Sequence, residues 1–388
     1  MVKRILTFNV IVLSLVSMFT DIASEMLYPI MPIFLKSIGF SVVLIGVLEG
    51  FAEAVAGLSK GYFGRLSDLS GKRVRFVRMG YLLSALSKPL LAAFTWPLWI
   101  FGARTLDRLG KGVRTASRDA LLSDEATPET KGRVFGFHRS LDTLGAAIGP
   151  FLALGFLFYY PGQYSKLFLL AFVPGCLAVA LTLLLREKPH EAAESSSRPK
   201  IGDFITFWVK SSPTYKRLVS GLLFFALFNS SDAFLLLRMK QAGLNDTSVI
   251  GIYIFYNLIF ALGAYPLGSL ADKIGLKKVL VGGMGVFAVV YAGMAVNTTV
   301  FGFIGLLLFY GIYAAATEGV SKAWISNITD KKETATAIGT YTAFQSVCTL
   351  IASSLAGAIW YFFGPAATFM VSAIAAALAM AYISRAQV

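Results

Sequence analysis

Cysteine and histidine are scarce in this sequence, with two of each among 388 residues. Cys176 and Cys348 lie in different apolar stretches, so the sequence predicts neither a disulfide nor a cysteine-based metal site. The Gly-Lys-Ser/Thr loop that holds nucleotide phosphates is also missing, which argues against ATP-driven chemistry. We therefore expect a protein that is not an enzyme and that carries no cofactor and no bound metal.

Charged residues are few as well. They make up 14% of the chain, whereas hydrophobic residues make up 56% and the mean hydropathy is +0.69. Apolar runs recur at roughly the 20-residue length that a helix needs to cross a bilayer. The sequence therefore predicts an all-α membrane protein with about twelve transmembrane helices. The expected spans are residues 6–35, 42–64, 74–95, 97–118, 132–158 and 165–186, then 215–239, 247–270, 278–297, 300–324, 334–361 and 365–384.

The net charge of +14 is distributed unevenly between the two sides of the expected membrane. Lysine and arginine gather in alternate loops, which are residues 72–78, 131–133, 273–278 and 331–332. The opposite loops carry only a few cations, namely Lys36, Lys166, Arg238 and Lys240. Cytoplasmic loops of membrane proteins are enriched in cations. We therefore expect both termini in the cytoplasm, and a lipid bilayer rather than nucleic acid as the partner of this basic chain.

One charged loop occurs twice. The copies are Gly64-Arg-Leu-Ser-Asp68-Leu-Ser-Gly71-Lys72-Arg73 and Gly268-Ser-Leu-Ala-Asp272-Lys273-Ile-Gly275-Leu-Lys277-Lys278. Six spans, a polar segment and six spans, with this loop in each half, resemble the major facilitator superfamily. The resemblance implies two six-helix bundles that expose a mid-membrane site to each side in turn. It also implies that Asp68 and Asp272, with the basic residues Arg73 and Lys278, serve as cytoplasmic gates.

The polar segment between the halves sets the expected domain boundaries. The N-terminal six-helix bundle covers residues 1–186, the cytoplasmic linker covers 187–213, and the C-terminal six-helix bundle covers 214–388. Within the linker, residues 201–209 read Ile-Gly-Asp-Phe-Ile-Thr-Phe-Trp-Val. They predict an amphipathic helix that lies along the inner membrane surface.

The span over residues 97–118 contains far more charge than a membrane helix usually carries. Its ionisable residues are Arg104, Asp107, Arg108, Lys111, Arg114 and Arg118. At about 100° per residue they fall within an arc of roughly 120°. Each charge in hydrocarbon costs roughly 2.5–3.5 kcal/mol, so such a face needs water or acidic partners. We predict a polar cavity in which Arg104, Arg108 and Lys111 contact the substrate.

Acidic residues on neighbouring spans are the expected partners of these cations. Asp21, Glu25 and Tyr28 share a face of the first span, Glu49 and Glu53 are one turn apart on the second, and Arg139 and Asp142 lie on the fifth. We predict that Asp21, Glu53 and Asp142 carry protons, with Glu49 and Glu25 as further candidates. Arg108 is expected to pair with such a carboxylate until a proton or substrate separates them. Tyr28 and Arg139 are candidate substrate contacts, and purely structural ion pairing stays open for each acid.

The second half is much less charged than the first. Its candidate substrate contacts are Asn229, Asp232, Glu318 and Gln345. Glu318 lies one turn from Lys322, and phenylalanines such as Phe224 and Phe228 lie near the polar residues of the seventh span. The sequence therefore predicts an asymmetric pocket with one ionic wall and one neutral or aromatic wall.

The span over residues 132–158 suggests a direction of transport. Gly136, Gly145 and Gly149-Pro150 resemble helix 5 of antiporters in this superfamily, although Ala153-Leu154 replaces the closing glycine pair. We therefore predict a monomeric, proton-coupled secondary transporter in the bacterial inner membrane that exports a small organic compound. An anionic or chelating compound is favoured, because the cations of residues 104–111 exceed the obvious needs of nearby acids.

Three other transport functions fit the same residues. They are a proton symporter that imports an organic anion or a siderophore-like metal chelate, a multidrug exporter of lipophilic cations, and a divalent metal transporter. A receptor or scaffold built on the same fold is a different class of protein. The sequence contains nothing that resembles a soluble sensor domain, which disfavours that class.

Overall fold

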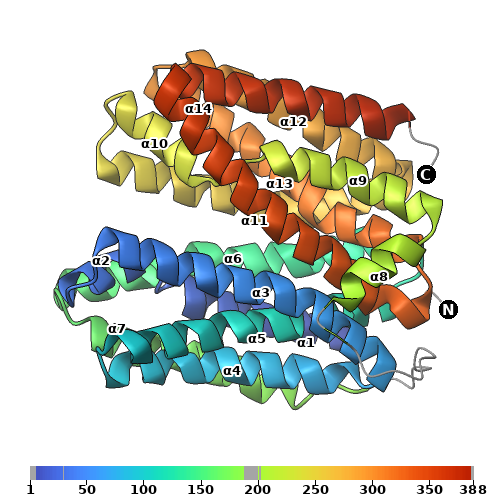
Figure 1. The fold of residues 1–388 in the computed structure, drawn as a ribbon, viewed down its shortest axis with the longest axis horizontal. Coiled ribbons are helices and arrows are strands. Elements are labelled where there is room, and N and C mark those ends of the chain that lie inside the picture. The colour runs from blue at the N-terminus through green and yellow to red at the C-terminus, as the bar shows by residue number, and fades with distance from the viewer. Residues whose placement is uncertain (1–5, 29, 188–199, 201, 386–388) are drawn as a thin grey trace. The chain divides into compact units, whose positions relative to one another are not determined.

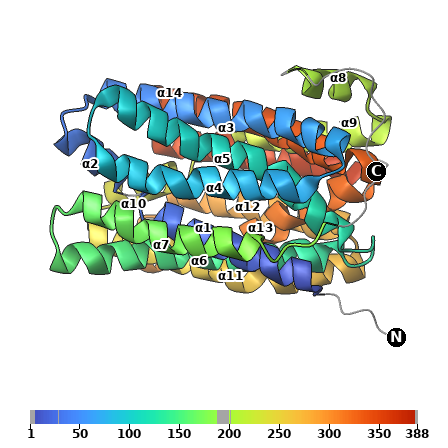
Figure 2. The ribbon, with the colours of Figure 1, turned by 90° about the horizontal axis from the view of Figure 1, so that it is seen from below.

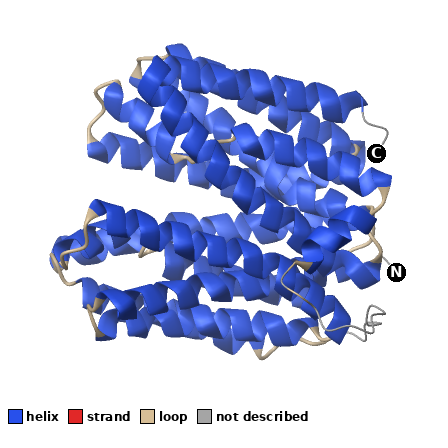
Figure 3. Ribbon diagram, viewed as in Figure 1, coloured by secondary structure: helices blue, strands red, loops and turns tan. Residues whose placement is uncertain are grey.

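A computed structural model describes residues 6–28, 30–187, 200 and 202–385, and these residues form helices joined by short loops, with no strand among them (Figure 3). The helices of the first half are α1 (Phe8–Glu25), α2 (Met31–Ser37), α3 (Val42–Ser70), α4 (Arg73–Ala93), α5 (Pro97–Asp124), α6 (Lys131–Tyr159) and α7 (Tyr164–Thr182). The others are α8 (Asp203–Lys210), α9 (Pro213–Phe228), α10 (Ala233–Gln241), α11 (Asp246–Ile274), α12 (Leu276–Val296), α13 (Val300–Asn327), the 3₁₀ helix η1 (Lys331–Glu333) and α14 (Thr334–Arg385). Figure 1 shows their order along the chain.

The described residues form two compact units. Unit 1 contains those of Met1–Glu125, Leu141–Val209 and Asp330–Ala343, and unit 2 contains those of Ala126–Ser140, Lys210–Thr329 and Phe344–Val388. In unit 1, α5 packs between α3 and α4 (Figures 1 and 2). In unit 2, α13 packs between α11 and α12. The same three-helix arrangement in both units agrees with the duplicated sequence pattern.

Residues with clear local preferences set the ends of α3 and α5. Ser41 caps the start of α3, where its hydroxyl accepts a hydrogen bond from the Leu44 amide at 3.2 Å. Gly71 ends α3 with a positive φ of 64°, a conformation that glycine adopts without strain. Pro97 occupies the first turn of α5, where a missing amide hydrogen costs nothing. These signals place the charged loop and the charged helix where the sequence predicts them.

Each of the twelve predicted spans corresponds to helix, but two of them are interrupted. The first is divided between α1 and α2, and the seventh is divided between α9 and α10 by residues 229–232. Conversely, the last two spans join in α14, where Gly364 (φ 84°) and Pro365 mark the kink between them. The amphipathic helix predicted over 201–209 appears as α8, and residue 201 lies outside the described residues.

Eight helical stretches among the described residues are long and apolar enough to cross a membrane. One of them, residues 331–385, is long enough to contain two of the predicted spans. Helices α3, α4 and α5 are not among the eight, because their charged side chains lower the hydropathy of these helices. These three helices hold most of the polar side chains of the site described below.

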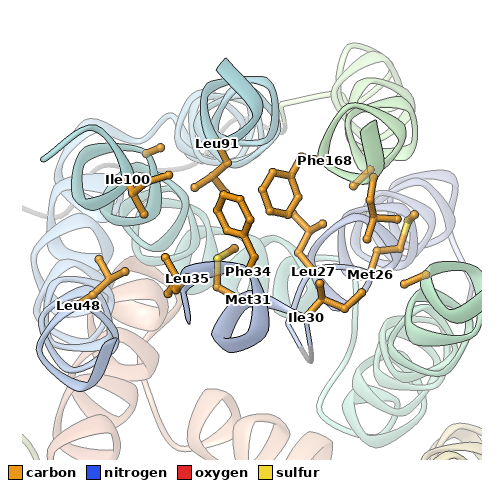
Figure 4. Packing of buried hydrophobic residues seen from close by; sticks show 14 of the residues in the cluster. Met26, Leu27, Ile30, Met31, Phe34, Leu35, Leu48, Leu91, Ile100 and Phe168 are labelled. Carbon is orange, nitrogen blue, oxygen red and sulfur yellow. The ribbon is translucent and has the colours of Figure 1, made fainter. Parts of the chain in front are cut away.

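An apolar cluster closes one end of unit 1. Phe34 packs edge-on against Phe168 with ring centroids 4.8 Å apart, and Leu27, Leu91 and Ile100 surround the two rings (Figure 4). Leu27 follows Glu25 of α1 closely, and Ile100 precedes Arg104 of α5 by one turn. The apolar cluster therefore lies next to the charged layer of the same helices.

Candidate functional site

Two arginines of α5 face two glutamates of α3 in unit 1. Arg104 and Glu49 form a bidentate pair, with Nε 2.8 Å from Oε1 and Nη2 2.9 Å from Oε2. One turn further on, Arg108 Nη1 lies 3.3 Å from Glu53 Oε1. The arginines are buried, whereas Glu49 is half-buried and Glu53 is exposed. The one-turn spacing of the glutamates thus matches the one-turn spacing of the arginines.

A third ion pair joins α4 to α5. Lys88 Nζ lies 2.7 Å from Asp107 Oδ1, and the Ser87 hydroxyl donates to the same oxygen at 3.3 Å. Asp107 Oδ2 also lies 3.5 Å from Arg104 Nη1. The sequence analysis did not single out Lys88. The signal that identifies it is a lysine, followed by Pro89, in the middle of an expected apolar span.

Asp21 and Glu25 line a pocket inside unit 1. They lie one turn apart on α1, and Ser24, Tyr28 and the polar face of α5 complete the lining. The pocket contains about 380 Å³ of space, part of which is open to solvent. Neither Asp21 nor Glu25 forms an ion pair or hydrogen bond with another residue in the described part of the chain. The pocket thus contains two carboxylates that other side chains do not neutralise by direct contact.

Two cations of the same pocket also lack a carboxylate partner in the part of the chain that the structure describes. Arg114 is buried, its Nη1 donates to the Ser84 hydroxyl at 2.6 Å, and its guanidinium lies 4.5 Å from the centre of the Tyr81 ring. The Nε atom of Arg114 has no hydrogen-bond partner within the described ranges. Lys111 is exposed and forms no ion pair among the described side chains.

The charges around the pocket are balanced. Its lining and the direct partners of that lining contain the cations Lys88, Arg104, Arg108, Lys111 and Arg114 and the acids Asp21, Glu25, Glu49, Glu53 and Asp107. The expected excess of cations, on which an anionic substrate was predicted, is therefore not found. It was overestimated because the sequence does not show that each glutamate of α3 meets an arginine of its own.

Asp142 lies in a polar cluster of unit 1 next to the pocket, within electrostatic reach of Asp21. The Ser17 hydroxyl donates to its Oδ1 atom, and Arg118 Nη1 lies 4.0 Å from the same oxygen. Arg118 Nε also donates to Asp119 Oδ1 at 2.9 Å. Asp142 is buried and is not part of the pocket lining. The candidate proton carrier Asp142 thus lies beside Arg118, which also contacts a second acid, Asp119.

The candidate contacts of the second half fall into two groups in unit 2. Arg139 of α6 forms an ion pair with Glu318 of α13, so that Glu318 meets a partner from α6. The second group lies around residues 229–232, where the Tyr310 hydroxyl donates to Asp232 Oδ1 at 2.7 Å. Asn229 Nδ2 donates to the Tyr313 hydroxyl at 2.8 Å, and Gln345 is half-buried without a hydrogen bond to any described residue.

The first gate candidate, Asp68, receives hydrogen bonds from the start of α14. Its Oδ2 atom accepts from the Thr336 amide and from the Thr336 hydroxyl, both at 2.7 Å. Arg73 Nη2 lies 3.0 Å from Asp68 Oδ1, and Arg73 also pairs with Asp124. Asp68 lies beyond the expected span 42–64. Burial raises its pKa to about 6, although Arg73 and the Thr336 donors act in the opposite direction.

The second gate candidate, Asp272, makes the equivalent contact in unit 2. Its two carboxylate oxygens accept from the amides of Gly132 and Arg133 at 2.7 and 2.9 Å, at the start of α6. The Arg133 side chain adds a third bond at 3.0 Å. Lys278 is exposed and forms no ion pair with a described residue. Each loop aspartate thus binds the N-terminal end of a helix, where the helix dipole favours negative charge.

Comparisons with known proteins agree with this geometry. The model of the Major Facilitator Superfamily matches residues 13–256 and 218–386. An uncharacterized MFS-type transporter of Methanocaldococcus jannaschii is 35% identical over 382 residues, which are 96% of this chain and 93% of that protein. A homolog of the multi-drug resistance efflux pump PmrA from Lactococcus lactis is 32% identical over 365 residues, covering 88% and 87% of the two chains. The crystal structure of the human organic anion transporter MFSD10 superimposes with a TM-score of 0.79 at 14% identity, covering 97% and 98%. The matched proteins are membrane transporters and not enzymes.

Proposed function

This chain belongs to the major facilitator superfamily, and we propose that it is a proton-coupled secondary transporter that exports a small organic compound from the bacterial cytoplasm by alternating access. Members of this family are multi-pass membrane transporters of small molecules. The proposal adds the coupling ion, the direction and the residues. In this proposal the protein acts as a monomer in the inner membrane. Both of its termini lie in the cytoplasm, and the distribution of lysine and arginine between its loops supports that orientation.

The observation that carries the proposal is the pair of carboxylates on α1. Asp21 and Glu25 line the pocket and have no direct partner in the described part of the chain. An ionised carboxylate at membrane depth is costly unless it is paired, and protonation removes that cost. These two groups are therefore suited to take up and release protons as the pocket opens to each side.

The other acids serve a different purpose in this proposal. Glu49 and Glu53 each contact an arginine, and Asp142 is hydrogen-bonded beside Arg118. An acid that is paired in this way stabilises the buried charge of its partner arginine. We assign proton transfer to Asp21 and Glu25 and assign the paired acids to positioning the arginines.

Opposition between substrate and proton favours export. A positively charged substrate and a proton each offset the negative charge of Asp21 and Glu25, so binding of one favours release of the other. That opposition is what proton antiport requires. The similarity to a multi-drug resistance efflux pump homolog over most of the chain also supports export.

An anionic or chelating compound is the second candidate substrate, because the buried Arg114 has an unpaired Nε in the pocket. For an anionic compound, the coupling between substrate binding and proton binding has the opposite sign to that for a cationic compound. Protonation of Asp21 or Glu25 removes a negative charge from the pocket, so an anion and a proton bind cooperatively. Such a compound favours symport, and therefore import, through the same residues.

The gate residues complete the proposed cycle. Asp68 with Arg73, and Asp272 with Arg133, hold helix N-termini that must be released and bound again when the pocket changes the side to which it opens. This role follows the family resemblance, and the contacts of each aspartate support it. Lys278 has no ion pair among the described residues, so its role depends on the resemblance alone.

Proton release on substrate binding tests this function. The purified protein is titrated in weak buffer with ethidium, a lipophilic cation, while a pH dye reports released protons. We expect proton release by the wild type and its loss in Asp21→Asn with Glu25→Gln. The control Glu53→Gln should still release protons. Full proton release and full pH-driven transport in the Asp21→Asn, Glu25→Gln double variant would refute the assignment, and proton uptake with an organic anion would instead support symport.

A further inference from the structure

The chain leaves the helical conformation in unit 2 between α9 and α10. α9 ends at Phe228 and α10 begins at Ala233, so residues 229–232 interrupt a stretch that is otherwise apolar and helical. Broken helices in membrane transporters are tolerated where the freed polar groups line a cavity or face a bound group. The polar residues Asn229, Ser230, Ser231 and Asp232 occupy this break.

Asp232 has no cation beside it. Its Oδ1 atom accepts the hydrogen bond from Tyr310, and the carboxylate forms no ion pair with any described residue. The side chain is half-buried, so part of it is accessible from the surroundings. This distinguishes Asp232 from Asp107, Glu49 and Glu53 of unit 1, each of which contacts a lysine or arginine.

Further buried oxygen atoms lie around the break. Ser230 Oγ and the hydroxyls of Tyr291 and Tyr310 lie close to one another and to the Asp232 carboxylate. Asn229 Oδ1 is buried without a hydrogen-bond partner in the described ranges. Buried polar atoms normally have partners, so this unpaired oxygen indicates a hydrogen-bond donor that binds there.

Aromatic rings form a wall next to these oxygens. The Tyr310 ring lies 4.9 Å from Tyr256 and 5.2 Å from Tyr313, centroid to centroid. The Phe287 ring lies 4.8 Å from Tyr313 and 3.9 Å from Tyr291. Aromatic rings attract organic cations through the negative charge of their faces. The break thus combines one carboxylate, several oxygen acceptors and an aromatic wall.

We propose, on the basis of the export function above, that the α9–α10 break binds a protonated amine of the transported compound. An ammonium group has one positive charge and three hydrogen-bond donors. The charge matches the single carboxylate, and the donors match Asp232, Asn229 Oδ1 and Ser230 Oγ. Substrates are therefore protonated amines, recognised in unit 2, whereas proton exchange takes place at Asp21 and Glu25 in unit 1.

Three probes with the same skeleton test the amine preference. Binding of 4-phenylbutylamine, 4-phenylbutan-1-ol and 4-phenylbutyrate to the full-length protein in nanodiscs is measured by calorimetry at pH 7. We expect the amine to bind at least tenfold more tightly than the alcohol, with the carboxylate weakest. Asp232→Asn should remove the difference between amine and alcohol without weakening the alcohol. Ser230→Ala, a smaller change that keeps the carboxylate, should weaken the amine about threefold.

The matched control is the Asp21→Asn, Glu25→Gln double variant, which should abolish proton release and keep the preference for the amine over the alcohol. Loss of the preference in this double variant but not in Asp232→Asn would overturn this site while leaving the proposed export function intact. Equal binding of amine and alcohol by the wild type would also overturn it, because water would then satisfy the oxygens. Stabilisation by NaCl over KCl that depends on Asp232, without amine binding, would identify a sodium site instead. Size-exclusion profiles and melting temperatures establish whether each variant is folded. If Asp232→Asn does not fold, the Ser230→Ala variant still decides the test.

Discussion

Lys88 of α4 and Asp107 of α5 form an enclosed ion pair in unit 1, with Nζ 2.7 Å from Oδ1 and side-chain exposures of 2% and 8%. Asp107 also lies near Arg104, and Arg104 donates two hydrogen bonds to Glu49. A chain of alternating charges thus runs from α4 through α5 to α3. It fixes the α5 face that lines the pocket, so the pocket geometry depends on a lysine outside the pocket.

Removing either member of this pair should strongly destabilise the protein. Lys88→Met or Asp107→Asn leaves an uncompensated buried charge, and each should lower the free energy of unfolding by about 3–5 kcal/mol. The double variant should lose far less than the sum, because neither charge then remains alone. Unfolding in denaturing detergent, followed by circular dichroism, measures all four proteins. Strictly additive effects would show that the two residues do not interact.

The Asp68 carboxyl should make stability depend on pH. Its pKa of about 6 in the folded protein exceeds the ordinary value of 3.8, so the folded state holds the proton more tightly than the unfolded state. The corresponding stabilisation is complete below pH 4 and is lost as the pH rises to 6 and above, by up to about 3 kcal/mol. The melting temperature of the wild type should therefore fall between pH 4.5 and 7 relative to Asp68→Asn. Parallel melting curves for the two proteins would contradict this assignment.

Two glycines of unit 2 should respond oppositely to alanine. A Cβ on Gly268 would lie 2.2 Å from the carbonyl oxygen of Gly132, so Gly268→Ala must push α11 away from α6. We expect a loss of about 1–3 kcal/mol. The matched control is Gly282→Ala in α12, where nothing lies within 4 Å, and where alanine should stabilise the helix by roughly 0.5–1 kcal/mol. Equal melting temperatures for both variants would show that the close approach of α11 and α6 does not contribute.

Glu187 caps the start of α4 from the beginning of the linker. Its two carboxylate oxygens accept from the amides of Arg73 and Val74, both at 2.9 Å. Glu187→Ala should cost about 0.5–2 kcal/mol, as the loss of other helix caps does. Hydrogen exchange should increase at residues 73–76 of α4 and stay unchanged in α12. Uniform protection across α4 in the variant would mean that another group takes over the cap.

The fold was predictable because its helices carry local signals. The lengths of the apolar stretches predicted the twelve spans, and the two copies of the glycine-containing loop predicted the duplication. The interruptions of the first and seventh spans were not predictable from length, because an apolar stretch looks the same whether its helix is continuous or broken. At residues 229–232, the polar run Asn-Ser-Ser-Asp was visible, but its effect on the backbone depends on partners such as Tyr310 and Ser353 that lie far away in sequence.

The candidate site was predictable in its composition and less so in its pairings. Helical periodicity placed the charges of α5 on one face, and it placed Asp21 and Glu25 together on α1. It did not show that Arg108 contacts Glu53 while Asp21 has no direct partner among the described residues, since that depends on the rotation of α1 and α3 about their axes. Lys88 was missed because a single lysine in an apolar span gives no periodic pattern.

The starts of α6 and α14 each belong to a compact unit that is built mainly from the other half of the sequence. A polypeptide cut within the linker would therefore contain no complete unit in either piece. In the N-terminal piece the Asp68 carboxylate would lose its Thr336 donors, and in the C-terminal piece Asp272 would lose the amides of Gly132 and Arg133. Each loop aspartate therefore keeps its full set of hydrogen bonds only when both halves of the sequence are present.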